Sequence, residues 1–352
     1  MALIIASGRM TDGDGSLAES TKVLARARKK NLQIITLEIV NLARRWDDKL
    51  SPHEFKSGAS AMAAIEKAKK LLKTKSVDLV VIKGSDFLKT GYEKNARAKF
   101  MQLYENGLTP LEGYDQLVAL FLEAHGASKE DFFRARDALF KNYLSTFKRQ
   151  HPIAKLPDER WYSSLTTYFR GVDCANPNVD FQGEIILAQK SVADLLEIPA
   201  PRRIKIIGNS FTKLKVDGIE SLPRVASYAH LRTAALKAQR EAKIDFKAEM
   251  KKGRALLDAY TCYPVVPMGL LLKLGLVKTV SEIPEFLATY EVTVTGGLNL
   301  GKAAWNLTSL NAIIDMREKL LMSKVARYGL VHGNGSLGNQ QGITILAAPN
   351  FS

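Results

Sequence analysis

A glycine-rich segment at residues 296–302 has the spacing of a loop that binds phosphate. It reads G-G-L-N-L-G-K and fits the pattern G-x-x-x-x-G-K between an expected strand and an expected helix. In nucleotide-hydrolysing proteins the next residue carries a hydroxyl that ligates magnesium, but here it is Ala303. Nucleotide hydrolysis is therefore a minor alternative, beside an anion site and glycines that only form turns.

A second glycine-rich segment lies at residues 332–342 and reads H-G-N-G-S-L-G-N-Q-Q-G. We expect it to be a turn between strands at residues 328–331 and 343–346. Two strands with glycine turns at one end place backbone N–H groups in a cleft. Such groups can hold an oxyanion or a phosphate.

Alternating strands and helices must position these two segments. Residues 290–295 are short and rich in β-branched side chains, which predicts a strand. Apolar residues then recur with a helical period through residues 305–320. The earlier part of the chain alternates in the same way, with strands at 2–7, 32–42, 77–82, 179–188 and 204–208 and helices at 17–30 and 59–72. The pattern predicts an α/β protein with a buried sheet.

The composition is that of a globular protein with a basic surface. Hydrophobic residues make up 46% of the 352 residues, and no apolar run approaches the roughly 18 residues that a membrane span needs. The formal net charge of +15 attracts anions. Because the basic residues are spread along the chain and accompany no nucleic-acid-binding motif, nucleic acid is not a favoured partner.

The cysteines and histidines suggest no structural cross-links. The two cysteines, Cys174 and Cys262, form no disulfide framework, and the five histidines show no metal spacing. We therefore expect a reducing compartment and no metal. No signal peptide is recognisable, so we expect the cytoplasm, with an organelle matrix as the alternative.

The order of the segments resembles the thiolase superfamily, most closely the bacterial thiolase-like proteins and the sterol-carrier-type thiolases. Residues 258–264, D-A-Y-T-C-Y-P, are similar to the family's Y-D-C-F or Y-S-C-F loop, and residues 174–187 are similar to N-x-x-V-D-x-G-A-A-x-x-L. T-V-T-G-G at 293–297, a helix, and G-L-V-H-G-N-G at 329–335 follow in the family's order. The resemblance covers nearly the whole chain and is strongest after Asp173.

The resemblance implies the thiolase fold, which has two similar βαβαβαββ halves in a layered α-β-α-β-α arrangement with an inserted, mainly helical loop domain. We place the N-terminal half at residues 1–200, the inserted domain at about 87–173 and the C-terminal half at 201–352. It also implies a homodimer or a pairing with a thiolase-family partner.

The resemblance further implies that the family's main catalytic group is missing. A thiolase carries an acyl group on the cysteine of a C-x-S-G motif at a helix N-terminus, where the thiolate is stabilised. Residues 55–58 read F-K-S-G, so Phe55 stands at the nucleophile position. Lys302 and Ala303 fall near the histidine and proline of the family's G-H-P motif.

Four candidates for remaining chemistry follow from the same resemblance. Cys262 is retained in the loop that supplies an acid/base cysteine, between Tyr260 and Tyr263, and His332 stands where the sterol-carrier-type enzymes have H-N-x-G-G. The alternatives are that Cys262 is a small core residue and that His332 only fixes a turn. The candidates for oxyanion or ligand binding are Ser57, Gly58, Asn299, Gly301, Lys302, Gly333, Asn334 and Gly335.

The expected function is binding of acyl-CoA or a related thioester, in lipid metabolism, without cysteine-based condensation and without a covalently bound cofactor. Residual acyl transfer, decarboxylation or a retro-aldol step would need only oxyanion stabilisation. Two alternatives stay open. One is an acyltransferase whose displaced nucleophile is Cys262 or Cys174, and the other is a non-catalytic partner of an active thiolase.

Overall fold

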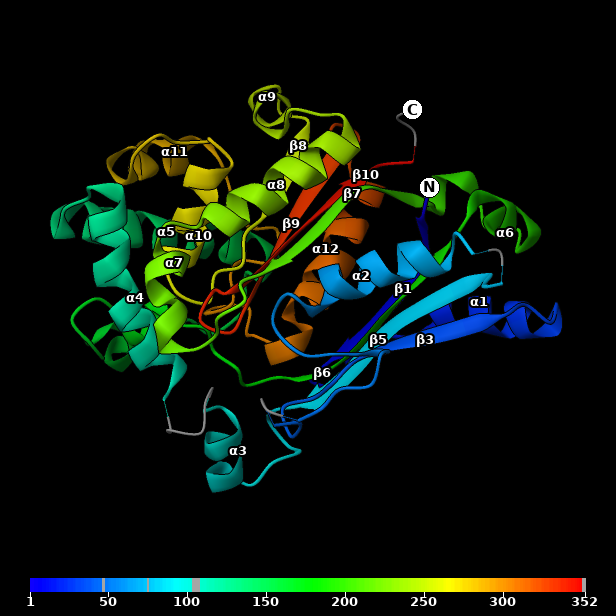
Figure 1. Cartoon of the computed structure of the whole chain (residues 1–352), viewed down its shortest axis with the longest axis horizontal. Helices are drawn as coiled ribbons and strands as arrows, with labels where there is room; N and C mark the ends of the chain where they lie inside the picture. Colours follow the sequence, from blue (N-terminus) through cyan, green and yellow to red (C-terminus); the bar gives the residue numbers. More distant parts are fainter. Residues whose placement is uncertain (46–47, 75, 103–107, 350–352) are drawn as a thin grey trace.

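A ten-stranded sheet runs through the middle of the protein (Figure 1). The computed structural model describes residues 1–45, 48–74, 76–102 and 108–349. The strands are β1 Leu3–Thr11, β2 Asp14–Ser16, β3 Ile34–Ile39, β4 Glu54–Phe55, β5 Leu79–Phe87, β6 Asp180–Ala188, β7 Ile204–Lys213, β8 Ala255–Asp258, β9 Tyr328–Gly335 and β10 Gln340–Ala347. The helices are α1 Ala18–Lys29, α2 Ser60–Leu71, α3 Lys94–Phe100, α4 Pro110–His125, α5 Lys129–Gln150, α6 Lys190–Leu195, α7 Leu222–Ala226, α8 Ala229–Ala242, α9 Phe246–Lys251, α10 Val265–Lys273, α11 Ile283–Thr289 and α12 Thr308–Met322.

The strand order β4-β3-β5-β6-β1-β7-β10-β9-β8 contains the same pattern twice. In the first half β1 is antiparallel to β6, β6 is antiparallel to β5, and β5 is parallel to β3. In the second half β7, β10, β9 and β8 repeat these relationships in the same order. The halves meet where β1 pairs with β7. The expected α/β class with two similar halves is confirmed, whereas the boundary at residue 200 stays a prediction.

Helices cover both faces of the sheet and produce the expected layers. The central helices α2 and α12 contact each other and contact strands of both halves. Helix α1 covers the outer face of the first half, and α8 covers the outer face of the second, against β7 and β10. Because side chains alternate along a strand, Ile4 of β1 faces the central helices while Leu3 and Ile5 face α1. Figure 1 shows α2 and α12 between α8 and α1.

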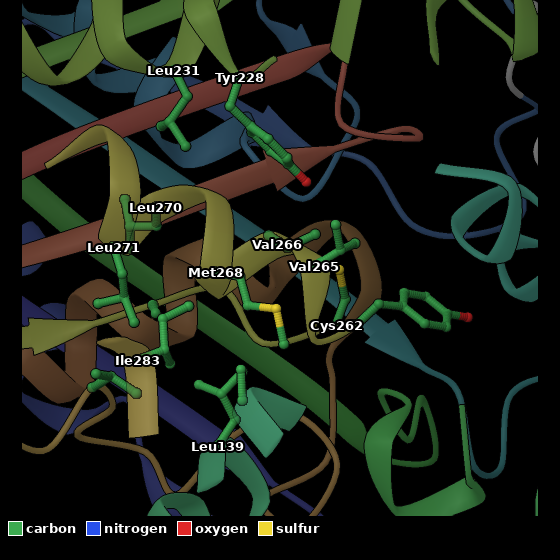
Figure 2. Packing of buried hydrophobic residues seen from close by; sticks show 14 of the residues in the cluster. Leu139, Tyr228, Leu231, Cys262, Val265, Val266, Met268, Leu270, Leu271 and Ile283 are labelled. Atoms are coloured by element: carbon green, nitrogen blue, oxygen red, sulfur yellow. The ribbon is translucent and has the colours of Figure 1, made fainter. Parts of the chain in front are cut away.

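A second group of helices lies beside the sheet. Helices α4, α5, α7, α10 and α11 gather there (Figure 1), and α4 and α5 belong to the expected insertion. Both begin with capping boxes, formed by Thr109 with Glu112 and by Ser128 with Asp131. Figure 2 shows how α10 packs against its neighbours. The residues labelled on α10 are Val265, Val266, Met268, Leu270 and Leu271, and those labelled on other segments are Leu139, Tyr228, Leu231, Cys262 and Ile283.

The prediction of a strand at residues 290–295 is wrong. These residues form no strand of the sheet, although the N–H of Ala259 donates to the carbonyl of Val292 at 2.8 Å. The buried Asp258 carboxylate accepts from the hydroxyl of Thr293 at 2.8 Å and from the N–H of Val294 at 2.8 Å. A side chain thus satisfies groups that a neighbouring strand would otherwise bind. The phosphate-loop alternative is not supported either, because residues 290–295, directly before Gly296, form no strand, and α12 begins only at Thr308.

The turn expected at residues 332–342 is also wrong in its extent. Strand β9 continues to Gly335 and β10 begins at Gln340, so only residues 336–339 form the turn. Two of the glycines allow α2 to pack closely on the strands. A Cβ on Gly333 would lie 2.7 Å from the Sδ of Met62, and one on Gly342 would lie 2.6 Å from its Cβ.

Candidate functional site

A cavity of about 260 Å³ lies where the residues before α2, the start of α4 and the loop before α10 meet. It contains polar groups from segments that are far apart in the sequence. Its polar lining residues are Ser57, Thr109, Tyr114, Tyr260, Cys262, Tyr263, Asn306, Asn334 and Ser336. Its other lining residues are Gly58, Met101, Pro110, Leu111, Ala175, Pro177, Ala303 and Trp305. We call it the first cavity.

Ser57, rather than Phe55, lines the first cavity from the segment before α2. Phe55 ends β4 and packs against the central apolar cluster, and it is not among the lining residues. Ser57 is 2% exposed, and its Oγ accepts a hydrogen bond from the N–H of Ala59 at 3.2 Å. The place beside the α2 N-terminus therefore holds a hydroxyl. Without an adjacent base, a hydroxyl is a much weaker nucleophile than a thiolate.

The thiol of Cys262 faces the first cavity and stays protonated at neutral pH. Its Sγ lies 3.8 Å from the Nδ2 of Asn334. Burial raises the pKa of the Cys262 thiol to about 12. Cys174 lies in the wall of a neighbouring cavity, and burial raises the pKa of its thiol too. Because the thiolate is the reactive form, neither cysteine is activated.

His332 is buried behind the first cavity and does not line it. Its Nδ1 accepts from the N–H of Tyr260 at 3.4 Å, and its Nε2 is 2.7 Å from the Oε1 of Gln341. Burial lowers the pKa of His332 to about 4, so the ring is neutral at neutral pH. The ring therefore orients its neighbours.

Tyr260 and Tyr263 both line the first cavity in the loop around Cys262. A Cβ placed on Gly58 would lie 2.3 Å from the hydroxyl of Tyr260, so this phenol approaches the backbone just before α2. Burial raises the pKa of Tyr260, which keeps the phenol protonated. The loop therefore presents a proton donor to the cavity.

Two residues of the site, Tyr114 and Gln341, belong to no sequence motif. Tyr114 comes from α4, in the expected insertion, and its hydroxyl accepts from the Nδ2 of Asn334 at 2.6 Å. Gln341 of β10 donates its Nε2 to the Oδ1 of Asn334, also at 2.6 Å. Neither belongs to a motif that we could recognise, and the only hint for Gln341 is its place in the glycine-rich segment.

A second cavity of about 510 Å³ adjoins the first, and Leu111, Ala175, Pro177 and Tyr263 line both. It contains three basic residues, Lys155, Arg160 and Lys302. The Nζ of Lys302 is 2.7 Å from a carboxylate oxygen of Asp12, and Arg160 pairs with Asp158 at 3.2 Å. Asp158 also lines the second cavity, so its charged lining is three basic residues and one carboxylate, and this excess of positive charge can receive a negatively charged group.

The predicted ligand-binding residues are divided between the two cavities. Ser57, Gly58 and Asn334 line the first cavity, and Asn299 and Lys302 line the second. The other three, Gly301, Gly333 and Gly335, line neither cavity. Asn299 is engaged within the protein, because its Nδ2 donates to the carbonyl of Val172 at 2.5 Å.

The described residues contain neither a group of side chains placed to hold a metal ion nor a helix that could cross a membrane. Within them, no group of three His, Cys, Asp or Glu side chains is arranged to hold a metal ion. None of the helices that the structure describes has the length and apolar character for spanning a membrane.

The repeated half-sheet pattern, the shared central helices and the cavity beside α2 define a thiolase-like fold. Solved structures confirm it. The monomeric SCP2-thiolase like protein type 1 from Mycobacterium smegmatis matches with a TM-score of 0.69 and 17% identity, over 99% of this chain and 77% of the other. An Ltp2-ChsH2(DUF35) aldolase matches with a TM-score of 0.65 and 16% identity, over 99% and 98%.

An acetyltransferase is similar to this chain as well. The acetyl-CoA acetyltransferase from Syntrophomonas wolfei matches with a TM-score of 0.61 and 14% identity, over 99% of each chain. No protein-family model and no curated protein matches the sequence. At these identities the likeness establishes the fold, and the chemistry has to be argued from the site.

Proposed function

We propose that the protein binds the thioester end of an acyl-coenzyme A in the first cavity and has lost cysteine-based Claisen condensation. The observation that carries this proposal is the composition of that cavity. Its lining includes Ser57, which carries a hydroxyl and lies just before α2, and Cys262, whose thiol is protonated. Such a cavity offers hydrogen-bond donors to a carbonyl but no thiolate to attack it.

The second cavity supports coenzyme A as the carrier of the acyl group. Four residues line both cavities, so the cavities are neighbours, and we expect an extended ligand to reach from one into the other. The basic residues of the second cavity suit the phosphates of coenzyme A, since cations and phosphate oxygens form strong charge-assisted hydrogen bonds. The net charge of +15 favours the approach of such an anion.

Calorimetric titration with acetyl-CoA, longer acyl-CoAs and free coenzyme A tests the proposal. We expect saturable heat and a raised melting temperature with at least one acyl-CoA. Leu111 lines both cavities, and Leu111→Trp, which places a larger side chain where they meet, should abolish binding. Ala119→Trp, at an exposed position of the same helix, should leave it unchanged. Absence of heat and of a thermal shift with every compound would refute the proposal.

A lyase reaction is the second candidate, and Tyr260 favours it. Retro-aldol cleavage removes the proton of the 3-hydroxyl to a base or to solvent and breaks the Cα–Cβ bond, which releases an aldehyde or ketone. Decarboxylation breaks the corresponding bond and releases CO₂. Both reactions leave a thioester enolate whose α-carbon takes up a proton. The protonated phenol of Tyr260 lines the first cavity and can supply that proton. One neighbour of the same fold is an aldolase.

The lyase candidate is tested by incubating the protein with 3-hydroxyacyl-CoA and malonyl-CoA and separating the products. Turnover should fall about 100-fold or more in Tyr260→Phe, because the ring is kept and the proton donor is lost. Equal turnover in the variant would exclude this role for Tyr260. If acyl-CoA binds without turnover, a non-catalytic role beside an active thiolase is the simpler function.

A further inference from the structure

We infer that the second N–H of the Asn334 amide is the carbonyl-binding donor of the first cavity, and that Gln341, held by His332, fixes this orientation of the amide. The ligand class is a planar carbonyl compound, of which the thioester of acyl-CoA is the case proposed above. The inference therefore rests on the proposed function. It adds Gln341 as a positioning residue and assigns the point at which the carbonyl oxygen is held.

The orientation begins at His332. Its Nδ1 accepts the backbone N–H of Tyr260, so in the neutral ring the proton sits on Nε2. That Nε2–H donates to the Oε1 of Gln341 at 2.7 Å. The tautomer of the buried histidine thus determines which end of the Gln341 amide faces it.

The orientation of the Gln341 amide determines the orientation of the Asn334 amide. Since its oxygen faces His332, its Nε2 faces the other way. Both protons on Nε2 are used, one to the Oδ1 of Asn334 at 2.6 Å and one to the carbonyl of Gly338 at 2.8 Å. Gln341 is fully buried, so no water competes for these positions.

The Asn334 amide can then point only one way. Its Oδ1 accepts from Gln341, so its Nδ2 faces the first cavity. One proton on Nδ2 goes to the hydroxyl of Tyr114 at 2.6 Å, and Tyr114 in turn donates to the carbonyl of Ser336 at 3.0 Å. All the hydrogen bonds from His332 to Ser336 therefore run in the same direction.

The second proton on the Asn334 Nδ2 has only a weak partner. It points toward the Sγ of Cys262 at 3.8 Å, and a thiol sulfur is a poor acceptor. Asn334 and Cys262 both line the first cavity. A ligand carbonyl oxygen that lies in the first cavity within reach of this second N–H would gain a full hydrogen bond from it, whereas a methylene group in the same position would not.

The consequence is a measurable preference for a carbonyl. The wild-type protein should bind an acyl-CoA about 3- to 10-fold more tightly than the matching S-alkyl-CoA thioether, which has CH₂ in place of C=O, because a single neutral hydrogen bond contributes about that factor. Gln341→Glu keeps an oxygen for His332 but cannot donate to Asn334. The Asn334 amide should then turn its oxygen toward the cavity, and the preference should disappear.

The test measures both affinities calorimetrically for the wild type, for Gln341→Glu and for Gln116→Glu, a matched exchange at an exposed position of α4. The ratio of the two affinities is the readout, since a merely structural loss weakens both ligands alike. Preference for the thioester in the wild type and in Gln116→Glu, and its loss in Gln341→Glu, supports the inference. An unchanged ratio in a folded Gln341→Glu overturns the role of Gln341.

A measurement on the wild type covers the case in which Gln341→Glu does not fold. The stretching frequency of a ¹³C-labelled thioester carbonyl should be lower when bound than in an apolar solvent, because a hydrogen bond weakens the C=O bond. An unshifted frequency, or equal binding of thioester and thioether, overturns this inference and leaves the proposed function standing. Failure of both ligands to bind overturns the proposed function and this inference with it.

Discussion

The rings of Tyr114 and Tyr263 stack with their centroids 4.3 Å apart and their planes 20° apart. Tyr114 lies on α4 in the expected insertion, whereas Tyr263 follows Cys262 in the loop before α10. The ring of Phe169 extends the contact, 5.3 Å from that of Tyr263. The stack therefore fixes the insertion to the C-terminal half at the first cavity, and the shape of that cavity depends on it.

A double-mutant cycle on this pair should give a coupling free energy of about 0.5–1.5 kcal/mol, which is typical of stacked aromatic pairs. The variants are Tyr114→Leu, Tyr263→Leu and the double variant, and the free energy of unfolding is measured with urea. Each single variant should be less stable than the wild type. Strict additivity of the two losses would show that the stack contributes nothing beyond burial.

Gly113 and Leu337 form a second contact between α4 and the C-terminal half, one that depends on size. A Cβ on Gly113 would lie 2.4 Å from a methyl carbon of Leu337 in the turn between β9 and β10. Gly113→Ala should therefore lower the free energy of unfolding by about 1–3 kcal/mol, despite the better helix propensity of alanine.

Shortening the partner should relieve this clash. Leu337→Ala alone should cost about 2–5 kcal/mol because it leaves a cavity. The double variant should lose less than the sum of the two single losses, since the new methyl group occupies part of that space. A loss equal to or larger than the sum, measured by urea unfolding, would contradict this account of the packing.

The sequence predicts most of the sheet because local pattern and final structure agree there. The apolar run at residues 2–7 overlaps β1, Leu3–Thr11, and the run at 77–82 overlaps β5, Leu79–Phe87. The strand expected at 290–295 fails because Asp258, which lies 35 residues before Thr293, binds it with a side chain. Pattern within a short window carries no trace of such a contact.

The candidate site is predicted only where the resemblance reaches. Cys262, Asn334 and Ser57 were expected from motifs, and all three line the first cavity. The sequence does not indicate Tyr114, because its partner Asn334 is 220 residues away and no motif in α4 includes it. The resemblance places Phe55 at the nucleophile position, but Phe55 ends β4 and packs against the central apolar cluster, and Ser57 lines the first cavity instead.

The buried carboxyl of Asp258 should make stability fall as the pH rises from about 4 to about 7. Burial is the largest cause that raises its pKa, from 3.8 to about 7, while hydrogen bonds from the Thr293 segment act against it. The folded protein thus holds the proton more tightly than the unfolded chain, and ionisation above the unfolded pKa favours unfolding.

Asp258→Asn isolates this effect from other carboxyls with raised pKa values, such as Asp86. The asparagine keeps an acceptor for Thr293 and cannot ionise. The stability of the variant relative to the wild type should therefore rise by as much as a few kcal/mol between pH 4 and pH 7. Urea unfolding at several pH values measures it, and a difference that does not change with pH would show that Asp258 does not titrate in this range.

The Cys262 thiol should be inert in the folded protein even though it lines a cavity. With the pKa raised to about 12 by burial, the thiolate fraction at pH 8 is roughly 10³-fold lower than for an ordinary cysteine. In a Cys174→Ser background, which leaves Cys262 as the sole thiol of the 352-residue chain, iodoacetamide should react about 10³-fold more slowly before unfolding in urea than after it. Mass spectrometry of the intact protein follows the reaction. Alkylation of the folded protein at the rate of a free thiol would mean an activated Cys262, and it would restore the acyltransferase alternative in which this sulfur takes the acyl group.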